Sequence, residues 1–457
     1  MTLAPMIDEA YGFLKDLLRI NTSNPPGNET GAVDFIARIL TEAKIPFSIL
    51  EASPGRPNLI AEVKGVSSHI PFLLSSHLDV VPVEESSDWS EPPFAGNETG
   101  GMLFGRGSLD MKYKSAFDLA ALLRYQKSEA KSHTLRAAFL ADEEQGGKFG
   151  VKFVTSKHLD AVRADYVLNE LGGFNIELGG KNFLLYQVGE KGTYRLSVEC
   201  RGKPSHGSIP SGGSSIEFLG RAIQRLGEEF GVQTTGTYYS TDTSKQFFGM
   251  IAEHTPSPMS DLFRALNNGP SGLAALDAVP EALLEASLKA QLRAMVCNTV
   301  APTMVKSGLS HNIIPGLATL LCDVRLMPDS NAEAFLQKVK KIFPEKAYSV
   351  SLLGDEGGYE IPLDDAVLKQ LSSSLEASWK VQLNEPISVP MLLPASSDNG
   401  TYFTAGIRPI GFAPLLFPRG FSGFSLSHTP DERIPRSSFY EGLSAYLTAL
   451  DSVMSGR

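Results

Sequence analysis

The stretch PFLLSSHLD, residues 71–79, is a short apolar run that ends in a histidine and an aspartate. Two other apolar runs are also followed by acidic residues. LRAAFLA (135–141) precedes three carboxylates, and DYVLN (165–169) precedes Glu170. Segments with helical periodicity lie between these runs. Strands that alternate with helices are typical of βαβ units and a mostly parallel sheet. Functional side chains gather at the carboxyl ends of such strands. The sequence therefore predicts an α/β fold with a site at that edge.

The segment 190–355 has a different pattern. A strand and a helix come first, followed by two strands, a second helix and a last strand. The order βαββαβ is typical of a ferredoxin-like sandwich. The Ala- and Leu-rich stretch 233–297 is predicted to be a helical insertion within it. Because the residues after this segment return to α/β character, we expect a discontinuous first domain, 1–189 with 356–457, interrupted by the second domain, 190–355.

The composition is that of an ordinary globular protein. The 457 residues carry 51 acidic and 41 basic side chains, and the formal charge of −10 gives no long-range attraction to nucleic acid or to an anionic membrane. No apolar run approaches the ~20 residues that span a bilayer. The three cysteines, Cys200, Cys297 and Cys322, form no CxxC pair. Their spacing argues against a cysteine zinc site and favours a reducing compartment. We therefore expect a soluble, cytoplasmic enzyme.

Three short motifs carry candidate metal or proton chemistry, although each is weak alone. In an extended strand His77 and Asp79 point the same way, and a ligand histidine needs its second ring nitrogen held by a carboxylate or carbonyl. In GRGSLDMK (105–112), Asp110 either caps the following helix or binds a metal. The successive carboxylates 142–144 form either a solvated acidic turn or a site in which a cation offsets their repulsion.

These motifs, together with Glu170 and a histidine in SHTPDER (427–433), form a set that suits two zinc ions. The candidate ligands are His77, Asp110, Glu144, Glu170 and His428. Each ion would take one histidine, one glutamate and one oxygen of a bridging Asp110, with an open position kept for water. A bridging hydroxide and the three carboxylates would balance the charge of the two metals, which permits burial of the cluster.

Six ordered segments match the pattern of one family. They are TSNPPGNE (22–29), SHLDVVP (76–82), WSEPPF (89–94), GMLFGRGSLDMK (101–112), DEEQGG (142–147) and HTPDER (428–433). With these motifs the chain resembles the co-catalytic zinc amidohydrolases and exopeptidases, which include aminoacylase-1, carboxypeptidase G, carboxypeptidase S, acetylornithine deacetylase and succinyl-diaminopimelate desuccinylase. The resemblance covers nearly the whole chain. It implies an α/β zinc domain interrupted by a ferredoxin-like lid and dimerisation domain.

The resemblance also implies roles for residues beyond the metal ligands. Glu143 would be the general base, and Asp79 would orient a ligand histidine. In the lid, His206 would reach over the site to the substrate carbonyl. Asn312 and Arg325 would contact the substrate, Arg325 through its carboxylate.

The chain departs from the family pattern in two places. Tyr113 and Lys114 stand where the family has glycine or another small residue, which leaves the shape of the following helix start open. The 233–297 insertion is longer than a minimal lid needs, and it resembles the longer aminoacylase and carboxypeptidase S branches.

The resemblance predicts a metal-dependent hydrolase that cleaves an amide or peptide bond beside a free carboxylate, in an N-acyl amino acid or a short peptide. The expected cofactors are two Zn2+ ions, with Co2+ or Mn2+ as substitutes, and a homodimer through the lid is the expected assembly. The apolar stretch PIGFAPLLFPRGFSGF (409–424) is either a buried loop or a rim that favours aromatic or aliphatic acyl groups. The alternatives are a catalytically silent binding protein on the same scaffold and a dedicated deacetylase or desuccinylase of amino-acid biosynthesis. A serine hydrolase or a nucleotide enzyme lacks its GxSxG, GxGxxG or GxxxxGK[ST] motif here.

Overall fold

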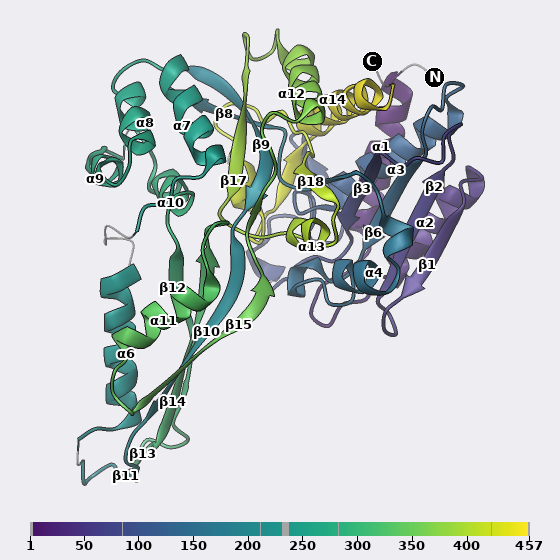
Figure 1. Ribbon diagram of the computed structural model, residues 1–457. Coiled ribbons are helices and arrows are strands. Elements are labelled where there is room, and N and C mark those ends of the chain that lie inside the picture. Colours follow the sequence, from purple (N-terminus) through teal and green to yellow (C-terminus); the bar gives the residue numbers. More distant parts are fainter. Residues whose placement is uncertain are drawn as a thin grey trace. The chain divides into compact units, whose positions relative to one another are not determined.

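The structure, a computed structural model, describes residues 3–84, 86–210, 212–230, 237–281, 283–421 and 423–455. Figure 1 shows the helices and strands of the chain, which divides into two compact units. Unit 1 comprises Met1–Gln187, Ile361–Pro390 and Ser397–Arg457, and unit 2 comprises Val188–Glu360 and Met391–Ser396. Each unit has a hydrophobic core of its own.

Four parallel strands form the centre of the unit 1 sheet. They lie in the order β6 (Leu135–Leu140), β3 (Phe72–His77), β7 (Tyr166–Asn169) and β18 (Arg408–Gly411). Nearly all of their residues are buried. Helices cover both faces of the sheet, and for this reason the strands appear in the sequence as apolar runs without alternation.

The expectation of a mostly parallel sheet is wrong for the outer strands. On one side β1 (Phe47–Glu51), β2 (Pro57–Val63) and β6 pair antiparallel. On the other side β9 (Lys181–Glu190) pairs antiparallel with β18 and with β8 (Phe174–Leu178). Gly179 and Gly180, both at positive φ, form the two-residue turn between β8 and β9. Such a turn suffices for an antiparallel hairpin, whereas a parallel pair needs a crossover of a dozen or more residues.

Helices pack on both faces of the unit 1 sheet. On one face α3 (Lys112–Lys127) contacts β2, β3 and β6, and α1 (Leu3–Leu18) and α14 (Arg436–Met454) pack on α3. A second cluster of buried side chains joins the strands to α4 (Val151–Lys157), α5 (Leu159–Val162) and α13 (Asn399–Thr404). The remaining helices are α2 (Thr30–Glu42), which packs on β2, and α12 (Ala366–Trp379), which packs on α14.

Helix α3 begins at Lys112, which settles the helix start that the sequence leaves open. Its first turn is made by Lys112, Tyr113 and Lys114, and all three side chains are buried. The Lys114 Nζ donates to Asp118 Oδ1 at 2.5 Å, so a buried ion pair replaces the small residues of the family pattern. The Tyr113 hydroxyl donates to the carbonyl of Ala413 at 3.1 Å. The two large side chains are therefore accommodated inside the core of unit 1.

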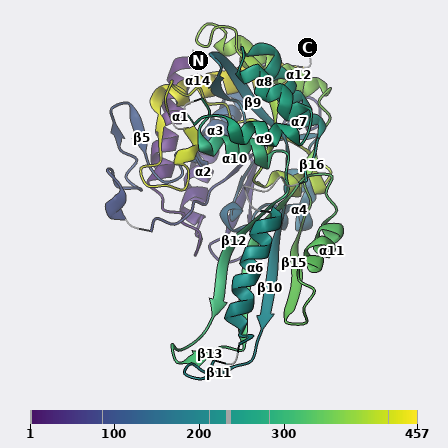
Figure 2. The ribbon, with the colours of Figure 1, turned by 90° about the vertical axis from the view of Figure 1, so that its left-hand side faces the viewer.

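Unit 2 is built on a four-stranded antiparallel sheet in the order β12-β14-β10-β15. Along the chain its elements are β10 (Gly192–Arg201), α6 (Ser215–Phe230), β12 (Thr299–Ser307), β14 (Leu317–Leu326), α11 (Ala332–Ile342) and β15 (Tyr348–Glu356). Figure 2 shows α6 lying along this sheet. Both helices bury their apolar side chains against alternate residues of β10 and β14. This is the predicted βαββαβ order and the ferredoxin-like strand arrangement.

Four helices interrupt unit 2 between α6 and β12. They are α7 (Asp242–His254), α8 (Met259–Asn267), α9 (Ser271–Ala278) and α10 (Ala286–Ala294). Phe247, Phe248 and Phe263 pack together at their centre. These helices, from Asp242 to Ala294, lie within the predicted insertion 233–297, of which 233–236 and 282 lie outside the described residues. No helix among the described residues combines the length and apolarity that a membrane span requires.

Candidate metal centre

The predicted site residues of unit 1 lie at the carboxyl ends of its parallel strands. His77 is the last residue of β3, and Glu170 directly follows β7. Glu143 and Glu144 lie in a single 3-10 turn, Glu143–Gln145, shortly after β6. Because β6, β3 and β7 are parallel neighbours, these ends meet at one edge of the sheet.

The Asp110 carboxylate lies between two histidines. Its Oδ1 atom is 3.1 Å from His77 Nε2, and its Oδ2 atom is 3.1 Å from His428 Nε2. The N-cap of α3 is Met111, which makes no side-chain cap hydrogen bond. Asp110 therefore does not cap that helix, and its two oxygens face two separate imidazoles as a bridging ligand would.

The glutamates complete two groups around this carboxylate. Glu144 Oε2 lies 3.3 Å from His428 Nε2, and Glu170 Oε2 lies 4.0 Å from His77 Nε2. Glu143 Oε2 lies 3.9 Å from His77 Nε2, so Glu143 also falls within ligand range of this histidine. Two ligand atoms that share one tetrahedral zinc ion, each about 2.0–2.2 Å from it, lie roughly 3.4 Å apart. The observed separations are of this size.

One buried oxygen supports a cation at this position. Glu144 Oε1 is buried, and none of the described residues donates a hydrogen bond to it. A buried carboxylate oxygen without a partner is costly unless a hydrogen bond or a metal satisfies it. The donor set of imidazole nitrogens and carboxylate oxygens is that of catalytic zinc sites. The residues present therefore fit a pair of divalent metal ions.

The interpretation of 142–144 as a solvated acidic turn is wrong. Asp142 is buried and has a left-handed φ of 72°, so its side chain points away from those of its two neighbours. Its Oδ1 accepts hydrogen bonds from Arg56 Nη2 and Asn24 Nδ2, both at 2.9 Å. Arg56 also pairs with the buried Glu29 through two hydrogen bonds. A guanidinium thus neutralises Asp142, which leaves the two glutamates to face the histidines.

Sequence reasoning missed Asn24, Glu29 and Arg56 as parts of this site. Asn24 and Glu29 lie in the TSNPPGNE motif, which was singled out only as a family feature. Arg56 lies in no quoted motif, and it reaches Asp142 from 86 positions away in the chain. The only usable signal for these residues was that motif, with its amide and carboxylate beside two prolines.

Asp79 supports the centre in a different way from the one expected. His77 Nδ1 lies 3.0 Å from the backbone carbonyl oxygen of Asp79 and 3.5 Å from its carboxylate. The carboxylate itself accepts hydrogen bonds from the backbone N–H groups of Glu143 and Glu144, each at 3.1 Å. The main chain of Asp79 therefore contacts the ligand histidine most closely, while its side chain holds the turn of the two glutamates.

The buried carboxylates of the cluster would be stabilised in their ionised form by positive charge nearby. Burial raises the pKa of Glu143 well above its ordinary value, and the Glu170 charge raises it further. Burial likewise raises the pKa of Glu170 and of Glu144. Hydrogen bonds to Asp110 and Glu144 raise the pKa of His428 to about 10. These raised pKa values mean that the side chains of the cluster tend to bind protons. Metal ions could replace those protons, because a bound metal ion favours ionised carboxylates and neutral imidazoles.

The three remaining predicted residues belong to unit 2. His206 lies on β11 (Ser205–His206), opposite Ile313 of β13 (Ile313–Ile314), and the N–H of Gly207 donates to the carbonyl of Asn312. His206 and Asn312 are thus neighbours, and both are exposed. Arg325 lies on β14, where Asp323 holds it in a two-point ion pair.

The Arg325 guanidinium also donates to the hydroxyl groups of Thr193 and Ser396, each at 2.8 Å. Arg325 therefore already has an acidic partner, and a substrate carboxylate would have to share it.

The apolar stretch 409–424 is partly core and partly rim. Phe412, Leu415 and Phe417 are buried, which agrees with the buried-loop alternative. Phe424 is only partly buried, and its ring meets that of Phe174 edge to face at 5.1 Å between centroids. Phe174 follows Glu170 by four residues and Phe424 precedes His428 by four. The partly exposed rings are thus attached to two segments that carry candidate ligands.

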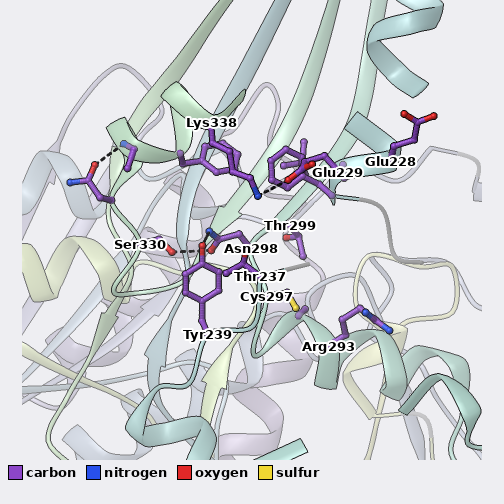
Figure 3. Close-up of a pocket in the computed structure, with 18 of the residues that line it drawn as sticks. Glu228, Glu229, Thr237, Tyr239, Arg293, Cys297, Asn298, Thr299, Ser330 and Lys338 are labelled. Atoms are coloured by element: carbon purple, nitrogen blue, oxygen red, sulfur yellow. Dashed lines mark hydrogen bonds and ion pairs between the residues drawn. The ribbon is translucent and has the colours of Figure 1, made fainter. Parts of the chain in front are cut away.

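A separate cavity of about 940 Å³ lies within unit 2 (Figure 3). Its described lining residues include no histidine, and its cations are paired, Lys338 with Glu229 and Arg293 with Asp277. Ser330 donates to Asn298, which donates in turn to the Tyr239 hydroxyl. None of the predicted site residues is among the described residues that line this cavity.

Fold and cluster together define a metal-binding α/β protein with hydrolytic side-chain chemistry. Peptidase family M20/M25/M40 matches residues 73–452. Aminoacylase-1 of Dictyostelium discoideum is 25% identical over 413 residues, which cover 89% of this chain and 90% of that protein. An N-fatty-acyl-amino acid synthase/hydrolase of Danio rerio is 26% identical over 397 residues, which cover 84% of this chain and 72% of that protein.

Solved structures share the fold of the whole chain. An M20 family metallo-carboxypeptidase from Sulfolobus solfataricus superposes with a TM-score of 0.74 at 18% identity, covering 98% of this chain and 99% of that one. A dinuclear metal-binding peptidase of the M20 family from Bacillus subtilis superposes with a TM-score of 0.59 at 15% identity, covering 99% of each chain. These similarities confirm the α/β fold class.

The chain belongs to peptidase family M20/M25/M40. It is a metal-dependent hydrolase of that family, as its motifs predict. The family assignment does not favour the alternative of a catalytically silent binding protein.

Proposed function

We propose that this enzyme uses two zinc ions to hydrolyse the amide bond of an N-acyl amino acid or of a short peptide, next to a free carboxylate. One observation carries the proposal: the Asp110 carboxylate has one oxygen 3.1 Å from His77 and the other 3.1 Å from His428. His77 and Glu170 would hold one metal, His428 and Glu144 the other, and Asp110 would bridge. Cobalt or manganese could occupy the same oxygen and nitrogen donors.

Bound zinc would supply Lewis acidity and would lower the pKa of water to about 7. Glu143 is the proposed general base. Its carboxylate lies on the ligand side of the 3-10 turn, and burial raises its pKa, which suits a group that takes a proton and later returns it. Glu143 would take the proton from the attacking water and deliver it to the leaving nitrogen. Because Glu143 is also within ligand range of His77, its role has to be separated from metal binding by experiment.

Unit 2 is proposed to act as the lid that supplies groups to the substrate. His206 Nδ1 lies 2.7 Å from the Ser208 hydroxyl and 3.2 Å from the Ser208 backbone N–H, and both groups can donate to it, which would leave the ring proton on Nε2. An Nε2–H donor on an exposed ring suits stabilisation of a carbonyl oxygen as it becomes negative. Asn312 lies beside His206 and would contact the same substrate. Arg325 would meet the substrate carboxylate, in competition with Asp323.

The partly exposed rings near Glu170 and His428 support a preference for apolar acyl groups or side chains. Phe424 and Phe174 are in contact, and neither is fully buried. We expect Phe424→Ala to lower kcat/KM for N-aroyl or long N-acyl amino acids more than for the N-acetyl compounds. Phe403→Ala, which changes an exposed ring elsewhere, is the control. A wild-type enzyme that prefers N-acetyl or N-succinyl substrates would contradict this preference and would favour the dedicated deacetylase or desuccinylase.

A homodimer through unit 2 is proposed from two exposed surfaces. β12 is an edge strand whose residues 301–307 are all exposed, and they include Met304 and Val305. One side of α6 also exposes apolar and small residues, namely Ile216, Gly220, Ile223 and Gly227. An uncovered edge strand with apolar residues invites pairing with another chain. Ile223→Asp should shift the protein to monomer in sedimentation velocity, whereas Val66→Asp, on another exposed apolar residue, should not.

The decisive experiment separates the general base from the ligands. Zinc-loaded wild type and Glu143→Gln would be assayed with a panel of N-acyl amino acids and dipeptides, and their metal content would be measured. We expect Glu143→Gln to keep both metal ions and to lose turnover. His77→Ala and Asp110→Ala should lose metal. Normal turnover by metal-replete Glu143→Gln would overturn the role of Glu143, and loss of metal from this variant would make Glu143 a ligand.

A further inference from the structure

Glu432 is a fully buried carboxylate that the proposed reaction does not use. Its Oε1 accepts hydrogen bonds from the backbone N–H groups of Leu109 at 2.8 Å and Asp110 at 3.1 Å. Its Oε2 accepts from the N–H of Gly107 at 3.1 Å and from Arg106 Nη1 at 2.6 Å. One side chain thus binds three backbone groups of the loop that ends in the bridging aspartate.

This loop depends on that carboxylate for its shape. Gly107 has a φ of 90°, and a Cβ atom there would lie 2.7 Å from Val80 Cγ1, so the loop passes close to the core. The N–H groups that Glu432 binds precede the first turn of α3 and point into the protein interior. Buried N–H groups that lose their acceptor cost free energy, and a loop in this position would have to rearrange to satisfy them.

Glu432 is also fixed relative to the second histidine. It follows His428 by four residues and directly precedes β19 (Arg433–Pro435), which pairs antiparallel with β5 (Met102–Phe104). The backbone N–H of Gly105 donates to the carbonyl of Glu432 at 3.0 Å. The segment that carries His428 and the loop that carries Asp110 are therefore joined at Glu432 by both main-chain and side-chain bonds.

A buried ion pair locks the position of the carboxylate itself. Arg106 is buried, binds Glu432 Oε2, and lies over the Trp89 ring at 5.2 Å from its centroid. Charge-assisted hydrogen bonds are roughly twice as strong as neutral ones, and this one is out of reach of water. The backbone at Asp110 cannot move relative to Glu432, four residues after His428, without breaking these contacts.

We propose that Glu432 is a positioning residue that fixes Asp110 against His428 and thereby sets the affinity for the metal ion that these two residues share. The inference rests on the proposed metal centre, and it does not depend on which substrate is cleaved. Residues that orient metal ligands typically change metal affinity or activity by about 10–100-fold when they are replaced. The loss should be larger for the metal ion shared by Asp110 and His428 than for the other, because Glu432 is joined to the main chain at Asp110 and close to His428.

The test compares Glu432→Gln with Asp431→Asn in the full-length protein. The amide of Glu432→Gln keeps the size of the side chain but turns one acceptor into a donor, so backbone N–H groups or Arg106 lose their partner. Asp431 is the adjacent carboxylate, and it accepts hydrogen bonds from the N–H and hydroxyl of Ser90 rather than from the Asp110 loop. Chelator-treated protein would be titrated with Co2+ and followed by calorimetry and visible absorption.

We expect Glu432→Gln to bind one Co2+ about 10–100-fold more weakly than the wild type does, to bind the other with a smaller loss, and to show a changed absorption spectrum. Asp431→Asn should match the wild type. A purely structural role would lower the melting temperature of Glu432→Gln and leave both Co2+ affinities unchanged, and that result would overturn the proposal. A wild type that binds two metal ions but hydrolyses no amide would overturn the proposed reaction while the binding result still decides the role of Glu432. A wild type without a second metal ion would overturn both.

Discussion

His77 is held by the main chain of Asp79, because its Nδ1 atom lies 3.0 Å from the Asp79 carbonyl oxygen and 3.5 Å from the carboxylate. A carbonyl can only accept, so it fixes the proton on Nδ1 and leaves Nε2 free to bind a metal. The carboxylate is then available for the backbone N–H groups of Glu143 and Glu144. Asp79 thereby orients the candidate ligand His77 with its carbonyl oxygen, and it orients the turn of Glu143 and Glu144 with its carboxylate.

The Asp79→Asn variant should therefore act mainly on the glutamate turn. The amide can still accept one of the two N–H groups, but its NH2 opposes the other, which displaces Glu143 or Glu144. We expect a loss of about 10–100-fold in kcat, while the pH at which His77 releases metal stays close to that of the wild type. The measurements are kcat and the pH dependence of zinc content. Zinc loss from this variant at clearly higher pH than from the wild type would show that the carboxylate, and not the carbonyl, holds His77.

The Arg56→Met variant should be strongly destabilised. Arg56 is the cation that pairs with the buried carboxylates of Glu29 and Asp142, and removal of one partner from a buried ion pair costs about 3–5 kcal/mol. Denaturant unfolding of the metal-free protein measures the free energy of unfolding. The control is Arg163→Met, which removes an exposed pair with Asp160 and should change stability by no more than about 1 kcal/mol. Equal effects of the two variants would contradict the buried network.

Lys191 should make stability depend on pH above neutrality. Its Nζ is buried and donates to the carbonyls of Cys297 and Ala294 and to the hydroxyl of Thr299, and burial lowers its pKa to about 7. Between that value and the ordinary lysine value of about 10.4, the unfolded chain binds a proton that the folded chain does not. The contribution of Lys191 to stability therefore rises with pH in this window, by at most about 1.4 kcal/mol per unit.

The measurement is the free energy of unfolding of wild type minus that of Lys191→Met, followed from neutral to alkaline pH. This difference should increase with pH. The exposed Lys64→Met should leave the profile of the wild type unchanged. A difference that is flat or falls with pH would show that Lys191 remains charged in the folded protein.

Metal removal should destabilise unit 1. A ligand that binds only the folded state adds about 2.7 kcal/mol at a free concentration 100 times its Kd, and the candidate ligands come from five separate stretches of unit 1. Dialysis against a chelator should lower the melting temperature, and added zinc should restore it. His428→Ala should show a smaller zinc-dependent shift. A melting temperature that does not respond to zinc in the wild type would contradict a metal centre that joins these stretches.

The sequence was sufficient for three of the four central strands, β6, β3 and β7, and for where their polar residues lie. Apolar runs buried on both faces are visible as such, and a residue directly after such a run, as Glu170 is, must lie at the edge of the sheet. The outer strands were predicted less well, because β8 and β9 pair through a local turn and their orientation leaves no mark on hydrophobic periodicity. Likewise, the sequence around Asp110 does not show whether this residue caps a helix or bridges two metal ions.

The supporting residues could not be predicted for a physical reason. Arg56 and Glu432 act through partners 86 and 322 or more positions away, and long-range hydrogen bonds leave no periodic pattern. Asp142 is set apart from Glu143 and Glu144 only by its left-handed backbone. The role of each residue became apparent only once its partner was placed in three dimensions.

The order of the segments along the chain has a consequence for biosynthesis. His77, Asp110, Glu144 and Glu170 all precede unit 2, whereas His428 and Glu432 follow it. Domains begin to fold as the ribosome releases them, at about 5–20 residues per second. A nascent chain would therefore hold four of the five candidate ligands, three of them carboxylates, while unit 2 is still being translated, and the proposed second metal ion could bind only near the end of synthesis.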